Sequence, residues 1–247
     1  VDLDSTATWQ FMISQPIVAA PLTGLFLGNM FGEAAAGLKL GLMVGTILQL
    51  IWIEQLPLGM NVPPDAALAS VLSVALGFIA GHGYESYSER EVCYTIALLL
   101  AVALGLLGRS LDMFVRRLNT GIDAWVSQKV ENNQLWAIAF GHTLGGMFTF
   151  TKAFIFCFLV VWLGVEPLRY FTSTLSFKHA SGFIVVQGLL PAVGFSVLAS
   201  MCIKDRREMR LFIGAIIVFT LLPAKIWLGI GAALLVIYRY GWRSAAK

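Results

Sequence analysis

The sequence predicts an all-α, polytopic integral membrane protein in which transmembrane helices are combined with re-entrant or broken helices. Composition is the first reason, because 58% of the 247 residues are hydrophobic, 13% are charged, and the mean hydropathy is +0.79. Soluble domains carry about 25% charged residues, so this composition excludes an ordinary soluble domain. Pattern is the second reason, because prolines and polar residues interrupt several of the long apolar stretches.

Apolar stretches recur along the whole chain, which is treated as a single transmembrane domain, 1–247. They cover residues 16–31, 37–56, 65–81, 92–108, 135–165, 181–203 and 211–240. A helix needs about 20 apolar residues to cross the hydrocarbon. The first stretch is short and contains Pro16 and Pro21, and the last is long and contains Pro223. Because proline interrupts a helix, both stretches predict re-entrant hairpins or pairs of half-helices.

Residues 37–70 hold the most informative pattern. Gly37, Gly41 and Gly45 recur at every fourth position, and Gln49 continues the series. Residues four apart lie on one face of a helix, so this helix presents a glycine face to a neighbouring helix and ends in a polar amide.

Polar and helix-breaking residues follow this glycine face. Glu54 comes first, and prolines at positions 57, 63 and 64 then precede Asp65. Proline removes a backbone donor and disfavours helix at the residue before it, so a regular helix cannot continue through 57–65. The segment predicts a broken membrane helix whose freed backbone groups line a polar cavity near mid-membrane.

Residues 109–134 predict an amphipathic cytoplasmic connector. Its apolar residues at helical spacing are Leu111, Phe114, Val115, Leu118, Ile122, Trp125 and Val126, and Arg116, Arg117, Asp123 and Lys129 lie opposite. A helix of this kind lies at the membrane interface or against a partner. Two interpretations remain open: a solvated connector with an apolar underside, or a docking surface for a soluble partner.

Basic segments predict the orientation of the chain, since short loops rich in Lys and Arg stay in the cytoplasm. Residues 204–210, with the sequence KDRREMR, form the densest such segment, and the C-terminal RYGWRSAAK is also basic. Two apolar spans separate 109–134 from 204–210, and the hairpin predicted at 211–240 returns the chain to the same side. All three segments are therefore predicted to lie on the cytoplasmic side. The segment 166–180 would then face outward.

Charge and cysteine usage exclude other classes. The net charge of +3 and the lack of a basic tract with interleaved aromatics argue against nucleic-acid binding. Cys93, Cys157 and Cys202 each lie in apolar runs without a second cysteine at metal spacing, so we expect no metal site, no disulfide and no cofactor. The opening VDLDSTATWQ lacks the features of a signal peptide, and we expect a native N-terminal segment ahead of it.

Several motifs resemble one protein family. Residues 15–70, with QPIVAAPLTGLFLG, GTILQLIW and LPLGMNVPPDAALAS, are similar to the membrane IIC subunit of the mannose/sorbose family of the bacterial phosphoenolpyruvate:sugar phosphotransferase system. WAIAFGHTLGGMF and GLLPAVGFSVLASM resemble later parts of the same subunit. PPDAALAS is the more specific motif, whereas the glycine spacing alone is weak. From the resemblance, we expect family members to carry a first membrane helix ahead of the segment near Trp9, before the start of this sequence.

The resemblance implies a function. Such subunits form a sugar channel with a IID membrane subunit, and separate IIA and IIB phosphocarrier proteins pass phosphate to the incoming hexose. The resemblance therefore implies a multi-pass subunit of the bacterial cytoplasmic (inner) membrane that binds and translocates hexose in the lipid bilayer. It implies a transporter subunit, not an enzyme, and a homo-oligomer of the IIC–IID unit.

Sugar recognition in a membrane needs rigidly held donors and acceptors, with a carboxylate that accepts hydroxyl protons. Gln49, Asn61 and Asp65 meet this need if the chain breaks between positions 57 and 64. The sequence PPD before an apolar run also predicts that Asp65 caps the N-terminus of the following helix. A capping carboxylate keeps a second oxygen that can bind a ligand. Glu54 either contacts sugar or pairs with a cation. His142 either makes a helix–helix hydrogen bond or lines the cavity.

Lys152 lies in an apolar stretch, where a charge is costly unless it is paired or hydrated. We predict that it pairs with Glu54 or Asp65, with direct sugar contact as the alternative. Two positions depart from the family pattern. Gln49 stands where relatives commonly carry an acidic residue, and Gln15 where they often carry arginine. Such changes keep hydrogen bonding and remove charge.

Two other functions stay open because of these departures. One is a drifted homologue that no longer transports sugar and acts as a membrane scaffold or sensor. The other is a stand-alone ion-coupled transporter, which requires carboxylates deep in the membrane. Glu54 and Asp65 are the candidates for that role.

Overall fold

The computed structural model describes residues 2–6, 11–53 and 62–221, and in this part of the chain it contains α-helices and no β-strand. Within these ranges, four helices are long and apolar enough to cross a membrane: α3 (Ala34–Ile51), α5 (Tyr87–Glu131), α6 (Trp136–Thr174) and α7 (Phe177–Cys202). The other helices are α1 (Asp2–Thr6), α2 (Pro16–Met30), α4 (Ala66–Gly81) and α8 (Arg206–Leu221). The predicted all-α membrane class is confirmed. The chain forms two compact units, Val1–Leu198 and Ala199–Lys247.

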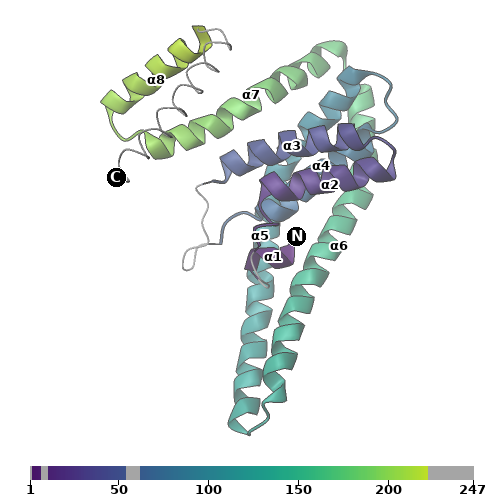
Figure 1. The fold of residues 1–247 in the computed structure, drawn as a ribbon. Coiled ribbons are helices and arrows are strands. Elements are labelled where there is room, and N and C mark those ends of the chain that lie inside the picture. The colour runs from purple at the N-terminus through teal and green to yellow at the C-terminus, as the bar shows by residue number, and fades with distance from the viewer. Residues whose placement is uncertain (1, 7–10, 54–61, 222–247) are drawn as a thin grey trace, which may run out of the picture. The chain divides into compact units, whose positions relative to one another are not determined.

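Helices α2 and α3 form a tight antiparallel hairpin (Figure 1). A Cβ atom on Gly24 would overlap the Gly37 carbonyl, and one on Gly41 would lie 2.5 Å from the Ala20 carbonyl oxygen. The predicted glycine face is therefore a helix–helix contact in which the two backbones touch. Helix α2 runs through Pro21 without a break, so the prediction of a hairpin within 16–31 is wrong. The hairpin is made by α2 and α3 together.

Helix α4 is the most enclosed helix of the first unit. It packs against α2, α3, α5 and α6, and most of its residues are buried. Its C-terminal end is held by Arg169 of α6, whose Nη2 donates to the Ile79 carbonyl at 2.7 Å and whose Nε donates to the Ala80 carbonyl at 3.3 Å. A cation at this end satisfies carbonyls that have no partner within the helix. The C-terminal end of α4 is thus fixed by α6.

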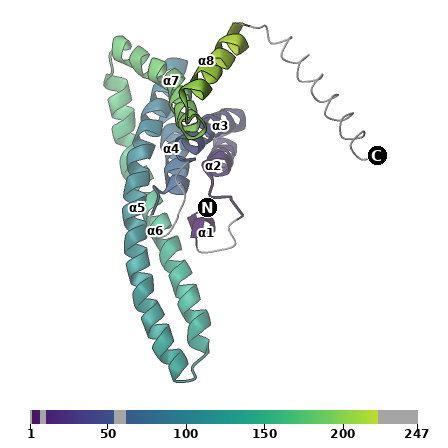
Figure 2. The same cartoon turned by 90° about the vertical axis from the view of Figure 1, so that its left-hand side faces the viewer.

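Helices α5 and α6 run side by side as a long hairpin (Figures 1 and 2). Helix α5 has 45 residues. At about 1.5 Å per residue it is roughly 68 Å long, about twice the thickness of the hydrocarbon. The amphipathic segment predicted at 109–134 is the second half of this helix up to Glu131, and it packs on α6, where Val126 contacts Gly141. Its position relative to the membrane stays a prediction.

Two predicted segments have different boundaries in the structure. The outward loop predicted at 166–180 is mostly helical, because α6 continues to Thr174 and α7 begins at Phe177. In the second unit, the basic segment 204–210 leads into α8, and Glu208 accepts hydrogen bonds from the backbone N–H groups of Lys204 and Asp205. The break predicted around Pro223 lies outside the described residues.

Candidate functional site

A capped helix start at the α3–α4 junction positions the candidate site. Pro63 and Pro64 precede Asp65, which is followed directly by α4. The Leu68 N–H donates to Asp65 Oδ1 at 2.9 Å, which confirms the predicted cap. The Asp65 N–H donates to the Gly105 carbonyl of α5 at 3.0 Å. Of the predicted break, 62–65 is non-helical, and Glu54 and Asn61 lie outside the described residues.

A glycine notch on α5 allows this close approach. A Cβ on Gly108 would lie 2.7 Å from the Asp65 Cβ, and one on Gly105 would lie 3.2 Å from Trp52. Both glycines sit in the interior of a helix, where glycine costs about 1 kcal/mol relative to alanine. The two glycines therefore lower the stability of α5 slightly, and in return the Asp65 side chain can pack directly against this helix.

An ionic cluster surrounds that carboxylate. Lys152 Nζ of α6 lies 2.8 Å from Asp2 Oδ2, 3.4 Å from Asp65 Oδ2 and 2.6 Å from Asp112 Oδ1. The Lys152 and Asp65 side chains are only 5% and 4% exposed. Buried charges persist where they are paired and hydrogen-bonded. The predicted pairing of Lys152 with Asp65 is confirmed, and Asp2 and Asp112 are partners that the sequence analysis missed.

The carboxylates of the cluster also have the geometry of a metal-binding group, since Asp2, Asp65 and Asp112 offer oxygens within 4.8 Å of one another. The Lys152 ammonium already lies among these oxygens, at 2.6 to 3.4 Å. An ammonium in this place supplies the positive charge that a metal ion would bring. The arrangement therefore fits a lysine-centred ion cluster better than a metal site.

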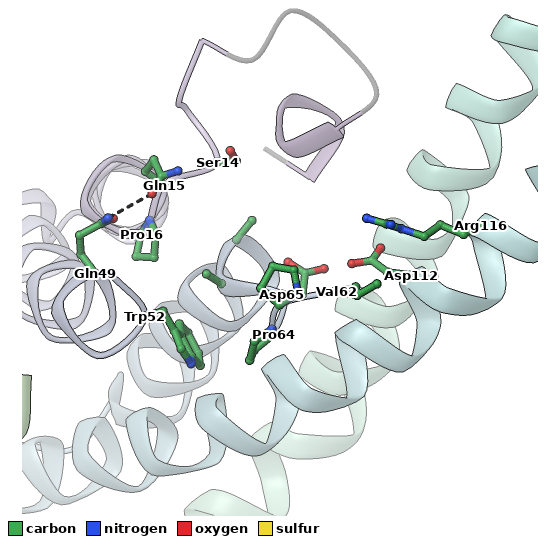
Figure 3. Close-up of a pocket in the computed structure, with 13 residues that line it drawn as sticks. Ser14, Gln15, Pro16, Gln49, Trp52, Val62, Pro64, Asp65, Asp112 and Arg116 are labelled. Atoms are coloured by element: carbon green, nitrogen blue, oxygen red, sulfur yellow. Dashed lines mark hydrogen bonds between the residues drawn. The ribbon is translucent and has the colours of Figure 1, made fainter. Parts of the chain in front are cut away.

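A cavity of about 160 Å³, here called the first cavity, opens beside the cluster. Its polar lining comes from Ser14, Gln15, Gln49, Asp65, Asp112 and Arg116, and the rest from Trp52 and nearby prolines, valine and alanines. Figure 3 shows Gln15 and Gln49 on one side of the space, with Asp65, Asp112 and Arg116 on the other. Amide, carboxylate and guanidinium groups together offer both donors and acceptors to a polar ligand.

The two glutamines hold each other in place. Gln49 Nε2 of α3 donates to Gln15 Oε1 at 3.1 Å, and Gln49 Oε1 accepts from the Ile17 N–H at 3.4 Å (Figure 3). Helix α2 begins after Gln15 without a side-chain cap of its own. Gln49 therefore serves one of the free N–H groups in the first turn of α2 and fixes one wall of the cavity.

The structure brings together only some of the predicted site residues. Asp65 and Gln49 line the first cavity. His142 does not; it lies on α6 and lines a different cavity with Asn119 and Asp123 of α5. Arg116 was missed because the charged face of 109–134 was interpreted as facing water. Its spacing of four residues from Asp112 places both on one helix face, but only the packing of α5 against its neighbours brings that face to the site.

The fold and this site define a polytopic helical membrane protein with a polar, charged cavity where one helix hairpin meets the start of the next helix. The sequence matches the family described as the sorbose-specific IIC component of the PTS system over residues 2–238. The chain belongs to this family.

Individual relatives agree with the family match. The mannose-specific EIIC component of the PTS system from Escherichia coli (strain K12) is 26% identical over 193 residues, which are 78% of this chain and 66% of the relative. The fructose permease IIC component of Bacillus subtilis (strain 168) is 25% identical over 187 residues, 76% of this chain and 63% of the relative. The match thus spans slightly less than two thirds of these relatives.

A solved structure shares the fold. It is described as "Structure of membrane protein", has a TM-score of 0.56 and 21% sequence identity, and the match covers 94% of this chain and 96% of that one. At this level of identity the likeness concerns the fold alone.

Proposed function

We propose that the protein is the hexose-binding and hexose-translocating IIC subunit of a sugar phosphotransferase system. The observation that carries this proposal is the first cavity, which combines amide, carboxylate and guanidinium groups in a membrane protein of this family. A sugar presents many hydroxyl groups, and it leaves water only where each hydroxyl finds a new partner. The relatives named for mannose and fructose make a hexose the natural ligand class.

Asp65 is the central sugar ligand in this proposal. A carboxylate offers about four lone-pair directions. The Leu68 N–H uses one on Oδ1, and Lys152 uses one on Oδ2. The remaining directions can accept protons from sugar hydroxyls, while Gln49 contributes from the opposite wall. Glu54 and Asn61 stay proposed ligands on sequence grounds.

The phosphoryl chemistry belongs to partners in this proposal. A IID membrane subunit completes the channel, IIA and IIB proteins carry the phosphoryl group, and the IIC–IID unit assembles into a homo-oligomer in the bacterial inner membrane. The three histidines lie in different surroundings: His82 beside Glu33 and Phe31, His142 in the separate cavity between α5 and α6, and His179 in contact with Ser176. Presentation of the sugar, not its phosphorylation, is the role of this subunit.

Uptake and binding of radiolabelled hexose test the proposal. Asp65→Asn keeps the cap, because Asn caps a helix about as well as Asp. It removes a charge-assisted hydrogen bond of roughly 1.5 to 3 kcal/mol, so hexose affinity should fall on the order of tenfold to a hundredfold. Glu131→Gln, which neutralises an exposed carboxylate at the far end of α5, is the matched control and should bind as the parent does.

Two results would contradict the proposal. If the intact complex binds no mannose, fructose or sorbose, the chain acts as a scaffold or sensor that retains the family fold. If Asp65→Asn binds hexose as tightly as the parent, the sugar site lies elsewhere.

A stand-alone ion-coupled transporter is the second candidate, and the ionic cluster favours it. The carboxylates of Asp2, Asp65 and Asp112 all lie against the Lys152 ammonium, so acidic groups that could couple a cation lie beside the first cavity. Vesicles that contain this chain without phosphocarrier proteins distinguish the two functions. Hexose accumulation driven by an imposed proton gradient would support ion coupling, and its absence would exclude it.

A further inference from the structure

Two rows of polar and small residues face each other along the α5–α6 hairpin. On α5 the row contains Asp112, Arg116, Asn119 and Asp123, and on α6 it contains Lys152, Thr149, Gly145 and His142. Steps of three and four residues keep each row on one face of its helix. Contacts connect the rows: Lys152 lies 2.6 Å from Asp112, and a Cβ on Gly145 would lie 3.4 Å from Asn119 Oδ1.

The residues of these rows that lie nearer the hairpin tip, from Arg116 to Asp123 and from His142 to Thr149, line a second cavity. It has a volume of about 590 Å³ and lies between α5 and α6. Arg116 lines both this cavity and the first one. Figure 3 shows the Arg116 side chain reaching from its helix toward Asp112 and Asp65. Arg116 is therefore the residue that the linings of the two cavities share.

One atom in the second cavity lacks a partner. Asn119 Oδ1 is buried and has no hydrogen-bond partner among the residues that the structure describes. Buried polar atoms of this kind are nearly always satisfied in native proteins. Because Gly145 has no side chain, it leaves space beside this atom. An oxygen acceptor in such a space calls for a ligand that brings a donor.

The remaining lining groups define the class of that ligand. The charges of Arg116 and Asp123 are opposite, and Asn119, His142 and Thr149 add further donors and acceptors. A site with opposite charges that mixes donors with acceptors fits an uncharged polyol and does not specifically favour an ion. Hexose is such a polyol, and it is the ligand already proposed for the first cavity.

We propose that the second cavity is a second hexose site, which receives the sugar from the first cavity past Arg116. This inference rests on the proposed function of the first cavity. It extends that function by adding a second binding site for the sugar, closer to the tip of the α5–α6 hairpin. The basic residues of 109–134 predict that this tip of the hairpin lies on the cytoplasmic side.

Equilibrium dialysis of the full complex against radiolabelled mannose, fructose and sorbose, each tested separately, measures the number of bound sugars. The parent should bind two molecules of the accepted sugar per IIC chain. Asn119→Leu removes the unpartnered acceptor and should abolish one binding class. Gln128→Leu, the same loss of an amide at an exposed position of α5, should leave both classes intact.

A second variant tests the same site independently, in case Asn119→Leu does not fold. Gly145→Ala places a methyl group 3.4 Å from Asn119 Oδ1, which is an ordinary contact distance that the fold accepts. It should weaken the same class at least tenfold and leave the other class unchanged. Asp65→Asn should weaken only the class that survives in these two variants.

The outcomes separate the two proposals. One bound sugar per parent chain, lost in Asp65→Asn and kept in Asn119→Leu, would overturn the second site and leave the first intact. Two bound sugars that are both unaffected by Asn119→Leu and Gly145→Ala would also overturn it. No bound sugar in the parent would overturn the proposed function itself.

Discussion

Gln49 on α3 and Gln15 at the start of α2 are hydrogen-bonded to each other, with 3.1 Å between Gln49 Nε2 and Gln15 Oε1. From the resemblance, these are the two positions that we expect to depart from the family pattern. The structure shows that the two glutamines are partners in one contact. An acid and an arginine in these places would form a charged pair, and the two glutamines retain a neutral version of it.

Restoring the charged pair tests this interpretation. Gln49→Glu alone places a carboxylate opposite an amide in a partly buried site, so it should lower thermal stability and hexose affinity. Gln15→Arg with Gln49→Glu should recover both, because a bidentate Arg–carboxylate contact replaces the amide contact. A double-mutant cycle from melting temperatures should give a favourable coupling of about 1 to 3 kcal/mol. Additive effects of the two single changes would refute the partnership.

Asp65 has both a capping and a charge-pairing role, which two substitutions separate. Asp65→Asn keeps the hydrogen bond from the Leu68 N–H and loses the charge opposite Lys152. Asp65→Ala loses both, and loss of the cap alone costs about 1 kcal/mol. In chemical denaturation of the purified protein, the alanine variant should therefore be less stable than the asparagine variant by at least that amount. Equal stabilities would mean that the cap contributes nothing.

The contact between α2 and α3 predicts a sharp difference between two glycines. In Gly41→Ala, the new methyl would lie 2.5 Å from the Ala20 carbonyl oxygen and 2.6 Å from the Pro21 Cα. Neither backbone atom can rotate away, so we expect a loss of about 1 to 3 kcal/mol and a lower yield of assembled protein. Gly188→Ala in α7 is the control, because a Cβ there meets nothing within 4 Å. Comparable yields for the two variants would contradict the predicted packing.

Lys152 balances three carboxylates, so its loss should be severe. Lys152→Met leaves Asp2, Asp65 and Asp112 without their shared cation, and breaking a buried ion pair costs about 3 to 5 kcal/mol. Adding Asp112→Asn should recover part of that loss, because one of the uncompensated charges is removed. The melting temperatures of the single and double variants measure this rescue. A double variant less stable than Lys152→Met would show that Asp112 stabilises the fold by some other contact.

The sequence predicts features that depend on neighbouring residues. The helix start at Asp65 follows from PPD before an apolar run, and the glycine face of α3 follows from the spacing of Gly37, Gly41 and Gly45. Both are local patterns, and both are confirmed. The continuity of α5 to Glu131 and of α6 to Thr174 was missed. Hydropathy measures how long a segment stays apolar, whereas these helices extend past their apolar parts because each stabilises the other.

The partners in the site could be predicted less well. Asp65 and Gln49 flank one break in the chain, so their shared cavity follows from a local argument. Asp2 and Asp112 reach the same place through helix packing, and no spacing in the sequence connects Asp2 to Lys152. His142 was grouped with the break because of its residue type. The structure separates it from Asp65 because it lies about three turns before Lys152 on α6.

The ionic cluster bears on the order in which the protein is made. Asp2, Asp65 and Asp112 are all synthesised before Lys152, which pairs with each of them in the folded chain. Until α6 is made, the carboxylates at the start of α4 and in α5 lack the Lys152 ammonium. Packing of α6 against α4 and α5 brings that ammonium to them. A chain truncated before residue 152 would therefore lack the ammonium that these three carboxylates share, so we expect the arrangement of α4 and α5 to be less stable in it than in the full chain.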